Sequence, residues 1–144
     1  MDVIQLARKL VATTPAKILQ KAIDRPEVKA AIIELNTEIQ LGQLNEDSLG
    51  NKLADNDPFG GYSVFTQKQK GVGQRDVDLH DTGAYYNSFR VVVLGSGDYA
   101  IDSNTSIHGD DLTVRWGVIE GLQKKHEIIA KKLIEKTYIK DLLR

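Results

Sequence analysis

The stretch LHDTGAYYNSFRVVVL, residues 79–94, decides how the middle of the chain folds, because it ends in a run of β-branched residues. Arg90 to Leu94 reads RVVVL and predicts a strand, since valine fits the pleated surface of a sheet. The turn formers GSGD follow, and Tyr99 to Ser103 can return as the paired strand. The sequence therefore predicts an antiparallel hairpin built around residues 88–103.

The first half of the same stretch predicts a tight turn and a short helix. Asp81 or Thr82 is expected to cap this helix through its side-chain oxygen, and Gly83 allows the backbone to turn tightly. The rings that follow are expected to give one or two side chains to the core: Tyr85, Tyr86 and Phe89. In this interpretation Asp81, Thr82 and Gly83 form a structural turn and take no part in catalysis.

The same letters, Asp81-Thr82-Gly83-Ala84, match the signature of an aspartic peptidase, in which two carboxylates share one proton. The chain carries the motif once, so such an enzyme would have to act as a homodimer. The context favours the structural turn, because RDVDLH before the motif is half polar. The downstream VVLGSG begins eleven residues after Asp81, which leaves no room for a flap. The peptidase is the enzymatic alternative.

Helical patterns dominate the first third of the chain. Thr14 and Pro15 are typical of a helix start, and Pro26 predicts a second one. The apolar residues before them fall three and four apart: Val3, Ile4, Ala7, Leu10 and Val11. We expect two or three consecutive helices across the first 40 residues. Helical spacing fades after Ile39, and TEIQLGQL, residues 37–44, is compatible with an extended strand.

Residues 54–76 are polar and glycine-rich and predict a long projecting loop or arm. Aromatic residues recur in it at three-residue intervals, a use that a disordered linker seldom makes of them. Its second half is basic. We predict an arm that is ordered against a partner, and a flexible solvent-exposed loop is the alternative. The candidate interface residues are Phe59, Tyr62, Phe65, Lys68, Lys70 and Arg75.

The C-terminal part predicts two helices. DLTVRWGVIEGL suggests a short helix with Asp111 near its cap and Trp116 packing inward. A long amphipathic helix follows from Gln123, with an apolar stripe formed by Ile128, Ile129, Leu133, Ile134, Tyr138 and Leu142. Gly121 to Arg144 carries seven basic and three acidic residues, so this part is +4 and the rest of the chain is −5. The lysines form either a solvated face or a face that meets an acidic neighbour, such as another copy.

Length and composition set the outer limits of the interpretation. A chain of 144 residues is the usual size of one domain, and no internal repeat or second domain is visible. There is no cysteine, and a net charge of −1 excludes nucleic-acid binding by bulk attraction. The N-terminus does not resemble a secretory signal or a membrane span. We expect no metal or cofactor, because the histidines are scattered and HGDD, residues 108–111, reads better as a turn and a helix cap than as a cation site.

The order of the segments resembles that of the small virion proteins of tailed bacteriophages, which sit at the head–tail joint or complete the tail. The resemblance covers about residues 35–125. It is carried by FGGYSVFT (59–66), LHDTGAYYNSF (79–89), RVVVL (90–94), DYAI (98–101) and RWGVIEGL (115–122).

The resemblance implies a non-enzymatic structural role in the neck of the virion. Copies would form a ring on portal, connector or tail-tube proteins, with passive contact to packaged DNA and none to a membrane. The protein would reside in the virion, and in the host cytoplasm during assembly. From the residues we expect a single α+β domain over 1–144, with N-terminal helices and a C-terminal helix packed on a small, mainly antiparallel sheet. A cellular protein-binding module is the further alternative.

Overall fold

The computed structural model describes residues 2–6, 8, 16–107 and 110–143. Its named elements are α2 (Ala16–Ile23), α3 (Pro26–Glu34), the π-helix η1 (Leu35–Gln43), α4 (Leu53–Asn56), α5 (Val64–Lys70), α6 (Ala84–Asn87), β1 (Arg90–Val93), β2 (Tyr99–Asp102), β3 (Ser106–Ile107), β4 (Asp110–Asp111), α7 (Leu112–Trp116) and α8 (Lys124–Leu142). The predicted α+β class is confirmed.

The hairpin forms as predicted. β1 pairs antiparallel with β2, with Arg90 opposite Asp102 and Val93 opposite Tyr99. The Leu94 N–H donates to the Asp98 carbonyl at 2.8 Å and closes the turn, in which Gly97 has a φ of +82°. A second antiparallel pair, β3 with β4, lies where we expected only a loop. Each of these strands has two residues, which is too short for an alternating pattern that would predict a strand from the sequence.

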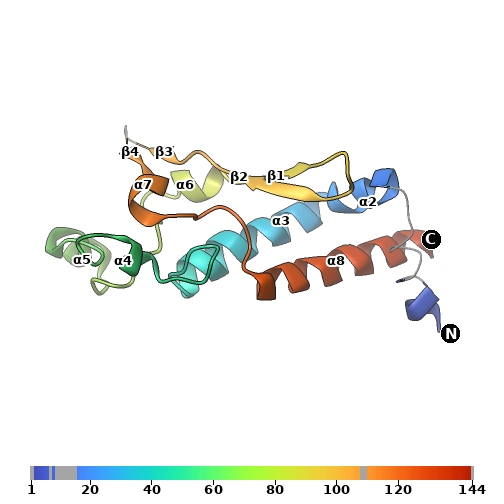
Figure 1. The fold of residues 1–144 in the computed structure, drawn as a ribbon, viewed down its shortest axis with the longest axis horizontal. Coiled ribbons are helices and arrows are strands. Elements are labelled where there is room, and N and C mark those ends of the chain that lie inside the picture. Colours follow the sequence, from blue (N-terminus) through green and yellow to red (C-terminus); the bar gives the residue numbers. More distant parts are fainter. Residues whose placement is uncertain (1, 7, 9–15, 108–109, 144) are drawn as a thin grey trace.

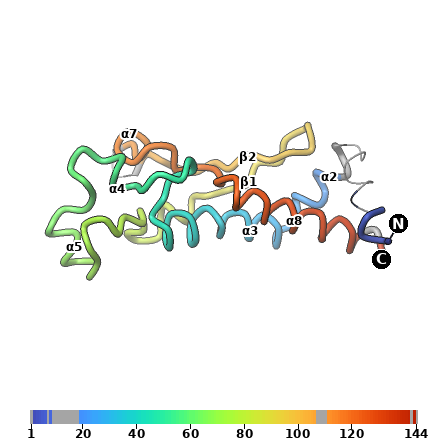
Figure 2. The backbone as a smooth tube through the Cα atoms, turned by 60° about the horizontal axis from the view of Figure 1, so that its bottom comes forward, coloured from blue at the N-terminus to red at the C-terminus, as the bar shows by residue number. Residues whose placement is uncertain are grey.

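α3, its continuation η1 and α8 form a layer beneath the hairpin (Figure 1). α3 and α8 lie side by side and run in opposite directions, and α2 packs against the C-terminal half of α8 (Figures 1 and 2). Val91 of β1 points into the apolar core between these helices. The other buried members of this core are Ala22, Ile23, Val28, Ile32, Leu35, Ala130, Ile134 and Tyr138.

The strand expected over residues 37–44 is wrong, because α3 continues directly into η1. The reason lies far along the chain. The Asn36 amide donates to the Ile119 carbonyl at 3.0 Å, and the Gln40 amide donates to the Gly121 carbonyl at 2.7 Å. Helical spacing brings both amides to one side of η1, where they hold the extended segment that leads into α8. Buried polar groups of this kind are costly unless they are paired, so the pairing favours the helix.

α8 forms from Lys124 as predicted, but its apolar stripe is only partly buried. Ile134 and Tyr138 pack into the core together with Ala130. Ile128 and Ile129 are instead 50% and 51% exposed, so their assignment to the buried stripe is wrong. Ala130 is fully buried, and the two isoleucines lie on other sides of the helix, about 100° and 200° away around its axis.

The start of the chain is helical over residues 3–6, and the side chains of Val3, Ile4 and Leu6 are exposed. The expected cap at Thr14 and Pro15 lies outside the described residues. The molecule is elongated: α4 and α5 lie at one end, and both chain ends lie toward the other (Figures 1 and 2). The segment proposed as an arm therefore occupies one pole of the molecule.

Candidate functional site

The proposed arm, residues 54–76, contains helical structure that the sequence analysis did not foresee. α5 begins where the Ser63 hydroxyl accepts the Thr66 N–H at 3.3 Å, and it ends at Gly71 with a φ of +67°. Before α5 the chain passes close to itself at Gly61, whose φ is +126°. A Cβ atom on Gly61 would lie 2.1 Å from the Gln74 carbonyl oxygen. The segment is thus a compact substructure rather than an irregular loop.

Arg115 of α7 joins this segment to the body of the protein. Its guanidinium donates to both oxygens of Asp57, whose side chain is fully buried. The Gly61 N–H donates to the same carboxylate at 3.1 Å. The hydrogen bond from Arg115 holds the pKa of Asp57 below its usual value against the opposing effect of burial. The guanidinium also lies over the Trp116 ring, 4.3 Å from its centroid.

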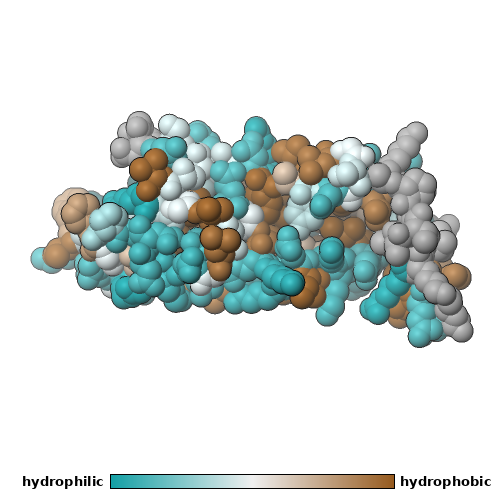
Figure 3. All heavy atoms as spheres, in the orientation of Figure 1, coloured by the Kyte–Doolittle hydropathy of each residue, from teal (hydrophilic) through white to brown (hydrophobic). Residues whose placement is uncertain are grey.

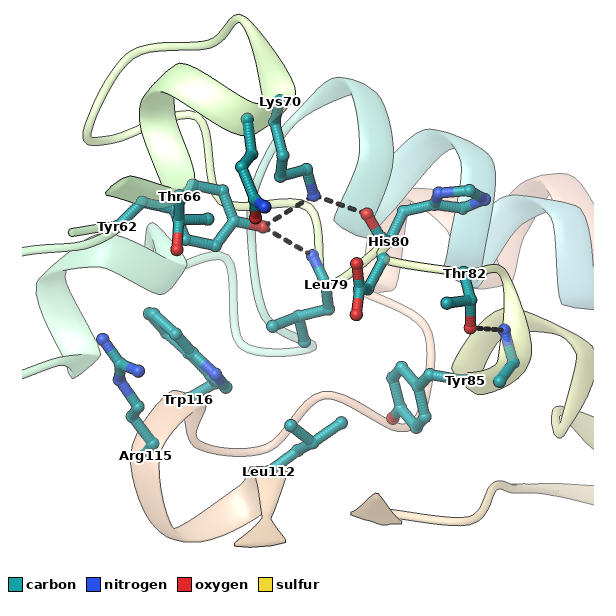
Figure 4. A pocket seen from close by; sticks show the side chains of 13 residues that line it. Tyr62, Thr66, Lys70, Leu79, His80, Thr82, Tyr85, Leu112, Arg115 and Trp116 are labelled. Atoms are coloured by element: carbon teal, nitrogen blue, oxygen red, sulfur yellow. Dashed lines mark hydrogen bonds between the residues drawn. The ribbon is translucent and has the colours of Figure 1, made fainter. Parts of the chain in front are cut away.

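A second anchor joins α5 to the irregular segment before α6 (Figure 4). The Lys70 ammonium donates to the Asp78 carboxylate and to the His80 carbonyl, each at 2.5 Å. The Tyr62 hydroxyl donates to Asp78 at 3.0 Å and accepts the Leu79 N–H at 3.3 Å. Tyr62, Lys70 and Asp78 therefore form one hydrogen-bonded cluster that fixes α5 in place.

The ionisation of this cluster follows from the same contacts. Burial raises the pKa of the Tyr62 hydroxyl above its usual value. Burial opposes the charge on Lys70 and on Asp78, but the hydrogen bond between them prevails. It raises the pKa of Lys70 and lowers that of Asp78, so both stay charged and paired with each other.

A cavity of about 330 Å³ lies between α5, α6 and α7 (Figure 4). Its walls include Tyr62, Lys70, His80, Asp81, Tyr85 and Trp116. The polar groups of Tyr62 and Lys70 are already engaged with Asp78. The cavity thus has aromatic walls and a charged edge whose groups are mostly satisfied by the protein itself.

Two residues of the predicted structural turn, Asp81 and Thr82, line this cavity just before α6. Gly83 adopts a φ of +86°, and the Thr82 hydroxyl accepts the Ala84 N–H at 3.3 Å. Asp81 is exposed, and its side chain makes no hydrogen bond within the part of the chain that the structure describes. An aspartic peptidase needs this carboxylate to face that of a second copy. The turn leads into a four-residue helix instead of a strand.

The outer surface of the arm carries exposed apolar side chains, which we name the apolar tip: Phe59, Val64 and Phe65. They are 81%, 65% and 70% exposed. A shallow groove of about 400 Å³ runs between Phe59, Val64 and Arg115. Figure 3 shows apolar atoms at the pole of the molecule where α5 lies. Val64 was missing from the candidate residues because it does not share the aromatic spacing.

The side chains of three of the six arm residues are therefore engaged by other groups of the same chain, and those of the other three are not, within the described residues. Tyr62 packs edge-on against Trp116 and, like Lys70, serves the internal anchor. Arg75 forms an exposed ion pair with Asp55 at 2.7 Å. Phe59, Phe65 and Lys68 are exposed and available to a partner. Two of the three cations of the predicted basic half are thus neutralised by carboxylates of the same chain.

Asp111 caps α7 by accepting the Thr113 N–H at 3.0 Å, and Trp116 is buried, as the sequence predicted. Within residues 2–6, 8, 16–107 and 110–143, no group of three or more histidine or acidic side chains could hold a metal ion. In the same ranges, no helix is sufficiently long and apolar to cross a bilayer.

Comparisons of the chain with protein-family models, with curated proteins and with solved structures found no match.

Proposed function

We propose that this protein is a non-enzymatic structural component of a tailed-phage virion, which forms a ring at the head–tail joint or completes the tail. The observation that carries the proposal is the apolar tip on a rigidly anchored base. Exposed aromatic rings are unusual on a free surface and are favoured at the centre of protein interfaces. Phe59 and Phe65 have no role in the domain's own core.

The anchors support this interpretation. Because Arg115 holds Asp57 and Lys70 holds Asp78, the segment that carries the tip is attached to the body of the protein at two points. A rigid surface loses little conformational entropy on association, which favours repeated assembly of identical copies. We therefore infer that the tip contacts a portal, connector or tail-tube protein.

The proposal is tested by substitution in the genome that encodes the chain. Phe59→Ser combined with Phe65→Ser is expected to yield heads and tails that fail to join, seen by negative-stain electron microscopy. The purified variant should keep the melting temperature of the wild type within a few degrees, since both rings are solvent-exposed. Leu49→Ser, at a residue that is 73% exposed outside the tip, is the matched control and should assemble normally. Normal particles from the double variant would contradict the proposal.

A further inference from the structure

The two long helices of the lower layer expose charges of opposite sign. The exposed side chains of α3 and η1 include three carboxylates and no cation: Glu27, Glu34 and Glu38. We call these the acidic row. The exposed side chains of α8 between Lys124 and Asp141 include one carboxylate, Glu127, and six lysines. Four of these lysines we call the basic row: Lys125, Lys132, Lys136 and Lys140.

Each row follows one side of its helix. Residues seven apart differ by only about 20° around a helix, and residues four apart by about 40°. Glu27 and Glu34 are seven apart, and so are Lys125 and Lys132. Glu38 and Lys136 each follow four residues later. The two rows thus have the same spacing in sequence, with Glu38 in the wider turns of η1. Several opposite charges can therefore meet when the two faces come together.

Neither row is satisfied within the described part of the chain. No ion pair or hydrogen bond within residues 2–6, 8, 16–107 and 110–143 engages a carboxylate of the acidic row or an ammonium of the basic row. Other charges on the same helices are paired: Lys29 of α3 binds Asp24, and Arg25 binds Asp141 of α8. The charges of both rows are therefore free, within the described residues, to pair with another molecule.

The basic row also has an apolar component. Ile128 and Ile129 are half-exposed and lie between Lys125 and Lys132 on α8. The acidic row is flanked by the exposed Ala30, whose small side chain permits close approach. A face that combines isoleucines with lysines is complementary to a helix face that has carboxylates and small side chains. The α3–η1 face has carboxylates and the small Ala30.

We propose that the basic row of one copy docks on the acidic row of a second copy. Each chain carries the two rows on different helices, so a contact between unlike rows leaves one row of each copy free and can be repeated from copy to copy. The inference deepens the proposed function, on which it rests for the closure of the copies into a ring. The contact is formed largely by exposed ion pairs, so it is weakened by salt.

The inference is tested by charge reversal and sedimentation velocity. The wild type should associate at low salt, with association reduced at least several-fold at 0.5 M NaCl, roughly where the screening length falls below 5 Å. Glu27→Lys/Glu34→Lys/Glu38→Lys should be monomeric, and so should Lys125→Glu/Lys132→Glu/Lys136→Glu. A mixture of the two variants should associate again, because each then offers the charge that the other lacks.

Restored association in the mixture also shows that both variants are folded. The inference is overturned if the wild type stays monomeric at low salt, if either variant alone associates like the wild type, or if the mixture remains monomeric. If the basic row bound nucleic acid instead, the wild type would be monomeric when no nucleic acid is present. Salt-sensitive association of a protein that is absent from virions would contradict the proposed function alone. If particles contain the protein and the charge-reversal variants associate like the wild type, this inference alone is contradicted.

Discussion

The Arg115 guanidinium meets the buried Asp57 carboxylate at two points, with Nε 3.1 Å from Oδ1 and Nη2 3.0 Å from Oδ2. Arg115→Met should destabilise the protein by about 3 kcal/mol, since it leaves Asp57 buried without its cation. Urea unfolding measures this change. The matched control is Arg75→Met, which breaks the exposed pair with Asp55 and should cost less than about 1 kcal/mol. Equal losses in the two variants would show that Asp57 does not depend on Arg115.

The close approach at Gly61 gives a second prediction. Gly61→Ala places a Cβ atom 2.1 Å from the Gln74 carbonyl oxygen at a positive φ, and should cost more than about 2 kcal/mol. Gly71→Ala also has a positive φ but meets no atom within 4 Å, so it should cost only about 1 kcal/mol. Thermal unfolding of the two variants separates the steric effect from backbone strain. If both lose the same stability, the arm is less tightly packed than described.

His126 predicts a dependence of stability on pH. Its Nδ1 donates to the Gln40 side-chain oxygen at 2.8 Å, and burial, followed by the charge of Lys125, lowers its pKa below the usual value. Glu46 partly opposes this shift. The folded state therefore binds fewer protons than the unfolded state. The contribution to stability is complete above pH 6.5 or so and is lost as the pH falls through the lowered pKa.

The measurement is the free energy of unfolding between pH 7.5 and pH 5 for the wild type and for His126→Gln. The slope in the wild type should be positive and should decrease in the variant. An unchanged slope in His126→Gln would assign the pH dependence to other groups.

An element could be predicted from the sequence where the residues that determine it lie close together along the chain. The hairpin around Val91 and the cap of α7 by Asp111 were predictable, because β-branched residues, turn formers and a capping carboxylate act over a few positions. η1 was missed because Asn36 and Gln40 find their partners more than 80 residues away. Tyr62 was assigned to an interface because its partners Asp78 and Trp116 lie 16 and 54 positions further along the chain, outside the local pattern.

At the candidate site, the exposed residues were easier to identify than the internal anchors. The three-residue spacing of Phe59, Tyr62 and Phe65 was visible in the sequence, and both phenylalanines are exposed. Nothing in the local pattern of Lys70 reveals that it binds Asp78, or that Arg115 binds Asp57 across 58 positions. The charge difference between α8 and the rest of the chain was visible, but its counterpart on α3 needed the burial pattern.

Asp81 gives a prediction about chemistry. Asp81→Asn should leave both stability and assembly unchanged, because the side chain is exposed and Thr82 and Gly83 form the turn. The measurement pairs thermal unfolding with cleavage of a peptide library at pH 4–6. Cleavage by the wild type that disappears in Asp81→Asn would support the homodimeric peptidase and contradict a structural role.

The location of the protein in assembled particles tests the central claim most directly. Particles produced by the encoding genome would be purified and labelled with an antibody against the chain, and then viewed by negative-stain electron microscopy. We expect label at the junction of head and tail or at the end of the tail, with several copies per particle. Particles without label, or a chain that remains monomeric in the cell fraction, would contradict the virion role and favour a cellular binding module.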